Sequence, residues 1–288
     1  MSPAHGLAAT PDGRTQLHWE STGRGAPVLL IMGLGLSGGA WWRTVPVLAR
    51  RLRVITFDHR GVGRSRAFSD VYTTEAMADD AACVLDAAGV GRAHVYGISL
   101  GGMVAQQLAL RHPERVRSIV LGATSPGGPR AAAPDDDVLA FLRGRLRMRS
   151  DEAARASVPF NYGPRCRRDH AERIEEDIAQ RLASPFSDRA YRVQLFAAGL
   201  HNCWGRLPRI AVPTLVVHGR HDRMVPVENG RILAERICRR RRTKSTTSSS
   251  GRTLRGPPGL VAPSTSDRTR SGWRRASCWA TIPPSEMP

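Results

Sequence analysis

One serine in this sequence, Ser99, lies in the glycine-rich run GISLGG that starts at Gly97. The preceding AHVY is typical of a short strand, and the following LGGMVAQQLAL is typical of a helix. A strand that passes directly into a helix strains the residue between them, and only small neighbours fit at Gly97 and Gly101. The hydroxyl is then exposed above a helix N-terminus, which favours developing negative charge. The pattern predicts that Ser99 is a nucleophile, whereas a chance glycine–serine turn would not need these flanks.

Three other segments follow predicted strands. GLG, which starts at Gly33, follows the apolar run VLLIM; DHRGVGRS (58–65) follows VITF; and HGRHDRMVP (218–226) ends the strand that starts at Thr214. In these segments, together with GISLGG, the sequence resembles the α/β-hydrolase family, whose D-x-R-G-x-G-x-S loop follows the fourth strand. The resemblance covers residues 14–125 and 204–237. It is closest to small ester and lactone hydrolases, including the 3-oxoadipate enol-lactonase-like group.

The resemblance implies a role for each segment. Ser99 would be the nucleophile, and Asp222 would be the acid that orients a catalytic histidine. The backbone N–H groups of Leu34 and Leu100 would form the oxyanion hole, where loss of one donor typically costs ~10²–10³ in rate. The 58–65 loop would be mainly structural, so no catalytic role is expected for Asp58. A serine at position 99 argues against dehalogenases and epoxide hydrolases of this fold, which use aspartate there.

The catalytic histidine is missing from its expected place. The family places it after one more strand beyond the acid, in the chain order Ser, Asp, His. Here that window reads RRRRTKSTTSSSGRTLRG, and all nine histidines lie at or before His221. We therefore expect Ser99 to be a poor nucleophile and the chain to be weakly active or inactive.

A change of reading frame near Cys238 would explain the break. One set of codons for the segment from Ser250 to Leu254, read one base later, spells Pro-Gly-Gly-His and places a histidine where this chain has Thr253. Reverse translation shows only that this is compatible with the sequence, and the coding DNA would decide it.

The remaining sequence predicts an α/β fold. Short apolar runs alternate with helical segments, which indicates a mostly parallel sheet covered by helices on both faces. We predict a core formed by residues 1–125 and 203–237, with an inserted helical cap over 126–202. Residues 238–288 would form a disordered or frame-shifted tail, because they are rich in Ser, Thr, Pro and Arg. The final strand and helix of the fold would then be missing, leaving the strand TLVVH as an exposed edge.

Composition limits the other functions. The net charge is +18, and nearly all of the basic residues are arginine. Residues 238–288 contribute 11 Lys+Arg against 2 Asp+Glu. Such a run can bind polyanions through charge alone, but no nucleic-acid recognition fold accompanies it. The longest apolar stretch, 27–42, is too short and glycine-rich to span a membrane. Five cysteines without close pairs or metal-ligand spacing favour the cytoplasm.

The predicted function is hydrolysis of a small-molecule carboxylic ester or lactone, with no metal or organic cofactor. Arginines of the predicted cap could attract a carboxylate-bearing substrate, although solvated surface arginines explain them more simply. The alternatives are a catalytically inactive hydrolase-like protein, either a binding module or a frame-shifted product, and a cofactor-free perhydrolase or carbon–carbon bond hydrolase of the same fold. The sequence does not specify the oligomeric state.

Overall fold

A computed structural model describes residues 3–10, 13–67, 71–184, 187–243 and 279–280. Its centre is a nine-stranded sheet with the order β1-β2-β4-β3-β6-β7-β8-β9, and β5 pairs with β2 off this path. The strands are β1 (Ala4–Ala9), β2 (Thr15–Thr22), β3 (Ala26–Ile31), β4 (Leu52–Phe57), β5 (Arg66–Ala67), β6 (Ala93–Ile98), β7 (Val116–Gly122), β8 (Thr214–Val217) and β9 (Trp279–Ala280). From β4 to β9 all neighbours in this order are parallel, while β1, β2 and β5 pair antiparallel. The predicted mostly parallel sheet is confirmed.

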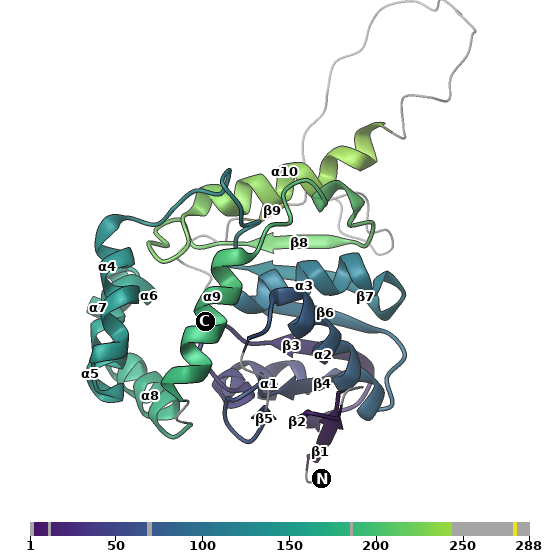
Figure 1. Ribbon diagram of the computed structural model, residues 1–288, viewed down its shortest axis with the longest axis horizontal. Helices are drawn as coiled ribbons and strands as arrows, with labels where there is room; N and C mark the ends of the chain where they lie inside the picture. The colour runs from purple at the N-terminus through teal and green to yellow at the C-terminus, as the bar shows by residue number, and fades with distance from the viewer. Residues whose placement is uncertain (1–2, 11–12, 68–70, 185–186, 244–278, 281–288) are drawn as a thin grey trace, which may run out of the picture.

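Helices pack on both faces of the sheet (Figure 1). They are α1 (Thr44–Leu48), α2 (Thr74–Ala87), α3 (Leu100–Arg111) and α10 (Val227–Thr243), with 3-10 turns at η1 (Gly38–Trp41), η2 (Pro113–Arg115) and η4 (Leu207–Arg209). Helix α1 has only five residues and contains Pro46, which lies in its first turn, where proline is tolerated.

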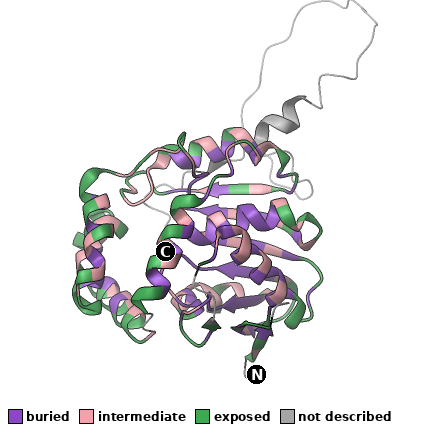
Figure 2. Cartoon of the chain, in the orientation of Figure 1, coloured by how far each residue is buried: buried purple, intermediate pink, exposed green. Residues whose placement is uncertain are grey.

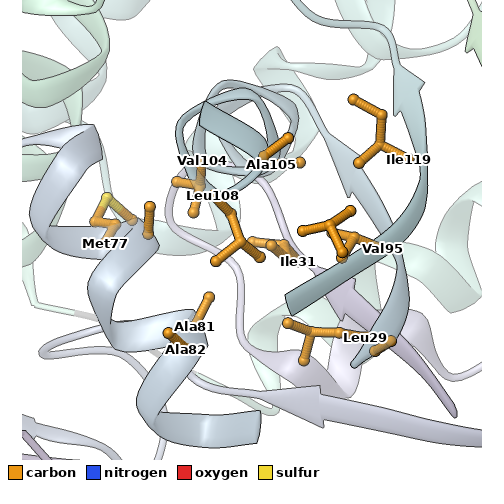
Figure 3. Packing of buried hydrophobic residues seen from close by; sticks show 14 of the residues in the cluster. Leu29, Ile31, Met77, Ala81, Ala82, Val95, Val104, Ala105, Leu108 and Ile119 are labelled. Atoms are coloured by element: carbon orange, nitrogen blue, oxygen red, sulfur yellow. The ribbon is translucent and has the colours of Figure 1, made fainter. Parts of the chain in front are cut away.

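Alternating residues of β3 show how both faces are buried. Leu29 and Ile31 belong to the large apolar cluster that includes α2 and α3, whereas Val28 and Leu30 belong to a second cluster with Trp41. Strands buried on both faces read as continuous apolar runs, as VLLIM does. Figure 3 shows strand residues Leu29, Val95 and Ile119 facing α3, and Figure 2 shows the central strands largely buried.

Residues 136–200 form a helical unit beside the sheet (Figure 1). It contains α4 (Asp136–Gly144), η3 (Arg145–Arg147), α5 (Ser150–Ala156), α6 (Val158–Asn161), α7 (Pro164–Asp169), α8 (Ala171–Leu182) and α9 (Asp188–Leu200). The chain leaves and returns at one place: Gly127 forms a β-bridge with Asn202, and the Cys203 N–H donates to the Pro126 carbonyl over 2.8 Å. In this position the unit would be able to cover the edge of the sheet at which β6 ends and α3 begins.

The last described segments differ from the sequence prediction in two respects. Helix α10 continues past Ile237 to Thr243, because arginine has a good helix propensity. The final strand is reduced rather than absent: β9 pairs in parallel with Val216 and Val217 of β8. An open sheet edge has unpaired backbone N–H and C=O groups that can pair with any extended segment. Because this pairing uses the backbone, the side-chain composition of the tail did not predict it. The rest of the tail, for which disorder is predicted, and the segment 250–254 used for the frame-shift hypothesis lie outside the described residues.

No helix among the described residues is long and apolar enough to cross a lipid bilayer.

Candidate functional site

Ser99 occupies the turn between β6 and α3 with φ 53° and ψ −120°, outside the regions that a serine ordinarily adopts. A Cβ at Gly97 would lie 2.1 Å from the Gly101 carbonyl oxygen, and one at Gly101 would lie 2.1 Å from that of Ile31. A Cβ at Gly102 would lie 2.5 Å from the side chain of Thr124. The glycines of the GISLGG run therefore permit the close approach of strand and helix that holds Ser99 in this conformation.

The loop after β3 lies against this turn. A Cβ at Gly33 would lie 3.3 Å from the Ser99 Cβ, and Leu36 N–H donates to the Gly33 carbonyl over 3.4 Å. Gly35, at φ 67°, takes the turn position that favours glycine. Leu34 follows Gly33, the residue that lies against Ser99, and Leu100 follows the serine as the first residue of α3.

The 58–65 loop supports its neighbours through hydrogen bonds. Asp58 accepts from the backbone N–H groups of Gly38 (2.8 Å) and Arg64 (2.9 Å). The buried His59 Nε2 lies 2.9 Å from the Met32 carbonyl oxygen, and burial lowers the pKa of His59. These contacts are consistent with a structural role for the loop.

Asp222 lies in the loop between β8 and α10. Its Oδ1 accepts the Val225 N–H over 2.8 Å, and its Oδ2 lies 3.5 Å from the Nε2 of His218. Burial raises the pKa of the Asp222 carboxyl. The backbone N–H groups of Val225 and Met224 and the nearby His218 lower this pKa but do not outweigh the effect of burial. A carboxylate kept partly out of water at a strand end is typical of a functional site.

His218 is the residue near Asp222 that the sequence did not indicate. It follows β8 directly, four residues before the acid, and that spacing is the only signal that could have suggested the contact. Its Nε2 lies 2.7 Å from the Val225 carbonyl oxygen, so this nitrogen is used as a donor inside the loop. The side chain has no exposed surface, and the contacts of His218 are with Val225 and Asp222 rather than with Ser99.

Three further histidines form side-chain contacts away from Asp222. His94 Nδ1 lies 2.7 Å from Ser118 Oγ, His112 Nε2 lies 2.7 Å from Asp79 Oδ1, and His201 Nδ1 lies 3.0 Å from Thr74 Oγ1. Within the described residues, no histidine is hydrogen-bonded to the Ser99 hydroxyl, and no group of three or more His, Cys, Asp or Glu could hold a metal ion. Ser99 and the loop after β3 thus lie together, and the described part of the chain places no histidine within hydrogen-bonding distance of the Ser99 hydroxyl.

Comparison with known proteins identifies the family of this chain. The family described as "alpha/beta hydrolase fold" matches residues 26–247. Among curated proteins, RutD of Azorhizobium caulinodans, which bears the name of a carbamate hydrolase, is 36% identical over 244 residues, covering 82% of this chain and 86% of that protein.

Two solved structures illustrate the fold. A thermophilic esterase from Thermogutta terrifontis superimposes with a TM-score of 0.67 at 28% identity, covering 82% of this chain and 87% of the esterase. The enol-lactonase from Burkholderia xenovorans has a TM-score of 0.69 at 23% identity, covering 83% of this chain and 96% of the lactonase, and shows the shared fold. The resemblance identified in the sequence is confirmed, and this chain belongs to the α/β hydrolase fold family.

Proposed function

We propose that the chain carries the site of a serine acyl hydrolase in which Ser99 attacks a carbonyl carbon. The observation that carries this proposal is the φ 53° backbone of Ser99, held between glycines that no larger residue can replace. The attack would form a bond from Ser99 Oγ to the carbonyl carbon and move negative charge onto the carbonyl oxygen. The N–H groups of Leu34 and Leu100 would stabilise that charge.

The proposed acid is Asp222, whose role in a complete site is to orient a histidine and stabilise its charged form. The chain has no histidine beyond His221. We infer that the proton of Ser99 has no efficient acceptor, so acylation and the later release of the acyl group are both slow. Loss of one triad member can still leave ~10³–10⁴-fold catalysis over water, and we expect no more than that from this chain.

Esters and lactones are the first substrate class, because the sequence motifs resemble those of small ester and lactone hydrolases and an esterase shares the fold. Carbamates are a second class, and the 36% identity to RutD favours them. Both classes present a carbonyl with a heteroatom leaving group, so the same serine and oxyanion hole would serve either.

Residues 126–202, which include the helical unit, would form a cap that selects the substrate. Residues 1–125 and 203–237 would form the core. The two ends of the inserted segment lie side by side, where Gly127 forms a β-bridge with Asn202, which supports this division. The cytoplasmic location stays a prediction.

A substrate panel tests the proposal. We would assay p-nitrophenyl butyrate, a γ-lactone and a p-nitrophenyl carbamate with the full chain and with Ser99→Ala, each in buffer containing imidazole as a soluble base. The proposal predicts turnover that depends on Ser99 for at least one class, and the preferred class decides between ester, lactone and carbamate. Equal rates for the parent and Ser99→Ala with every compound would refute the assignment of Ser99.

A further inference from the structure

One helix of the helical unit reaches the loop beside Ser99. In Figure 1, α9 runs between the sheet and the helices α4 to α8. From this helix, the side chain of Gln194 enters the interior with no exposed surface, and its Oε1 accepts the backbone N–H of Gly35 over 2.8 Å. The two residues are 159 positions apart in the chain. The contact therefore joins the inserted segment to the glycine loop after β3.

The bonded N–H belongs to the central peptide of the turn that starts at Gly33. Leu36 N–H closes this turn onto the Gly33 carbonyl, and Gly35 has φ 67°. In such a turn, rotation of the central peptide converts one turn type into another at little steric cost when glycine is present. An acceptor fixed opposite the Gly35 N–H selects one orientation. The adjoining peptide, which carries the Leu34 N–H, is then fixed as well.

The helix that carries Gln194 is itself held close to the core. A Cβ at Gly61, in the 58–65 loop, would lie 3.2 Å from the Cβ of Ala190, one turn before Gln194. Val193 of α9 and Leu34 of the glycine loop both pack against the main apolar cluster. The acceptor thus comes from a helix that packs against the core, and such packing is what allows a side chain to orient a neighbouring loop.

We propose that Gln194 is a positioning residue that sets the orientation of the Leu34 N–H in the oxyanion hole, so that the helical unit contributes to the chemistry as well as to substrate selection. This proposal rests on the proposed function of Ser99. Gln194 would not touch the substrate. It would act through the Leu34–Gly35 peptide.

The first test measures the contact itself. Amide hydrogen exchange of Gly35 would be followed in the full chain for the parent, Gln194→Leu and Gln194→Glu. Gln107→Leu is the matched control. Gln107 is also fully buried, but its Nε2 donates to Oε1 of Glu75 on α2, over 2.7 Å, and not to the loop after β3. We expect Gln194→Leu to exchange the Gly35 amide at least about 5-fold faster, since a net hydrogen bond contributes about 1 kcal/mol. Gln194→Glu keeps an acceptor and should retain the protection, and Gln107→Leu should leave Gly35 unchanged.

The second test separates positioning from simple loss of stability. Ser99-dependent hydrolysis with added imidazole would be measured for the same variants, well below their melting temperatures. We expect Gln194→Leu to lower kcat by about 10-fold to 100-fold with KM within about 2-fold, because the oxyanion donor acts mainly in the transition state. Gln194→Glu should recover most of kcat. A change in KM with unchanged kcat, or an equal loss in Gln107→Leu, would overturn the proposal.

The two failures are distinguishable. If the parent and Ser99→Ala hydrolyse the ester equally, the proposed function itself fails and the oxyanion role fails with it. If the parent depends on Ser99 but Gln194→Leu matches the parent in both exchange and kcat, only the role of Gln194 is wrong.

Discussion

The two ends of the proposed site are built to different degrees. Around Ser99, backbone geometry and side-chain identity agree: Gly97 and Gly101 allow the strained turn, and the loop after β3 lies against it. Around Asp222, the acid is present and partly buried, but the neighbouring histidine, His218, donates its Nε2 proton within its own loop. The backbone around Ser99 thus has the geometry that the proposal needs, whereas no described histidine pairs with Asp222 in a position that the hydrogen bonds connect to Ser99.

This difference reflects how each end is encoded. The nucleophile end comes from one continuous stretch of sequence, in which short strand, turn and helix follow one another. The base would have to come from a segment beyond α10 that returns to the sheet edge. In this chain the described part of that segment is β9, a two-residue strand that contains no histidine. The described part of the chain beyond α10 thus supplies no histidine, whereas the strand–turn–helix around Ser99 is in place.

The largest expected effect comes from breaking the intact end. Gly101→Ala would place a methyl group against the Ile31 carbonyl oxygen, a backbone atom that cannot rotate away. We expect a loss of about 3 kcal/mol or more in the free energy of unfolding, measured by urea denaturation. Gly91→Ala is the control, because nothing lies within 4 Å of its Cβ position. Equal stability of the two variants would contradict the close packing at this turn.

A second prediction asks whether an existing histidine is available as a base. Burial lowers the pKa of His201 to about 4, below its ordinary value of 6.5. The unfolded chain therefore takes up this proton at higher pH than the folded one, so the stability present above pH 6.5 is lost as the pH falls towards 4. We expect a loss of about 3 kcal/mol over this range, at ~1.36 kcal/mol per pKa unit.

Urea denaturation at a series of pH values measures this slope. His201→Gln should flatten the profile between pH 6.5 and 4, and the same replacement at the exposed His5 serves as the control. A folded-state titration of His201 near 6.5, observed by NMR, would show that this imidazole is accessible to protons and would reopen its candidacy as a base.

A smaller effect is expected at Asp222. Because burial raises the pKa of this carboxyl, its charged form destabilises the folded state at neutral pH, and the cost grows as the pH rises through that pKa. Asp222→Asn keeps an oxygen that can accept the Val225 N–H, and we expect it to raise the free energy of unfolding at pH 7. The gain should vanish in acid, where the parent carboxyl is protonated. A clear loss of stability at pH 7 would instead show that the carboxylate is a structural anchor.

Much of this arrangement could be predicted from sequence because it depends on local patterns. The apolar run 28–32 and the GISLGG turn specify a buried strand and a nucleophile turn with residues close together in the chain. The contacts of Gln194 with Gly35 and of His218 with Asp222 could not be predicted in this way. The first needs the packing of a helix 159 positions away, and the second needs the path of an irregular loop. The pairing of β9 with β8 was also missed, because any extended segment can satisfy an open edge.

In the proposed site, Ser99 is held for attack on a carbonyl carbon but has no histidine as its base. The most direct measurement is hydrolysis of p-nitrophenyl butyrate by the full chain with and without imidazole, with the rate of Ser99→Ala subtracted to remove the direct reaction of imidazole with the ester. We predict a Ser99-dependent rate close to zero in plain buffer that rises with imidazole concentration. A substantial Ser99-dependent rate in plain buffer, unchanged by imidazole, would show that one of the nine histidines already serves as the base.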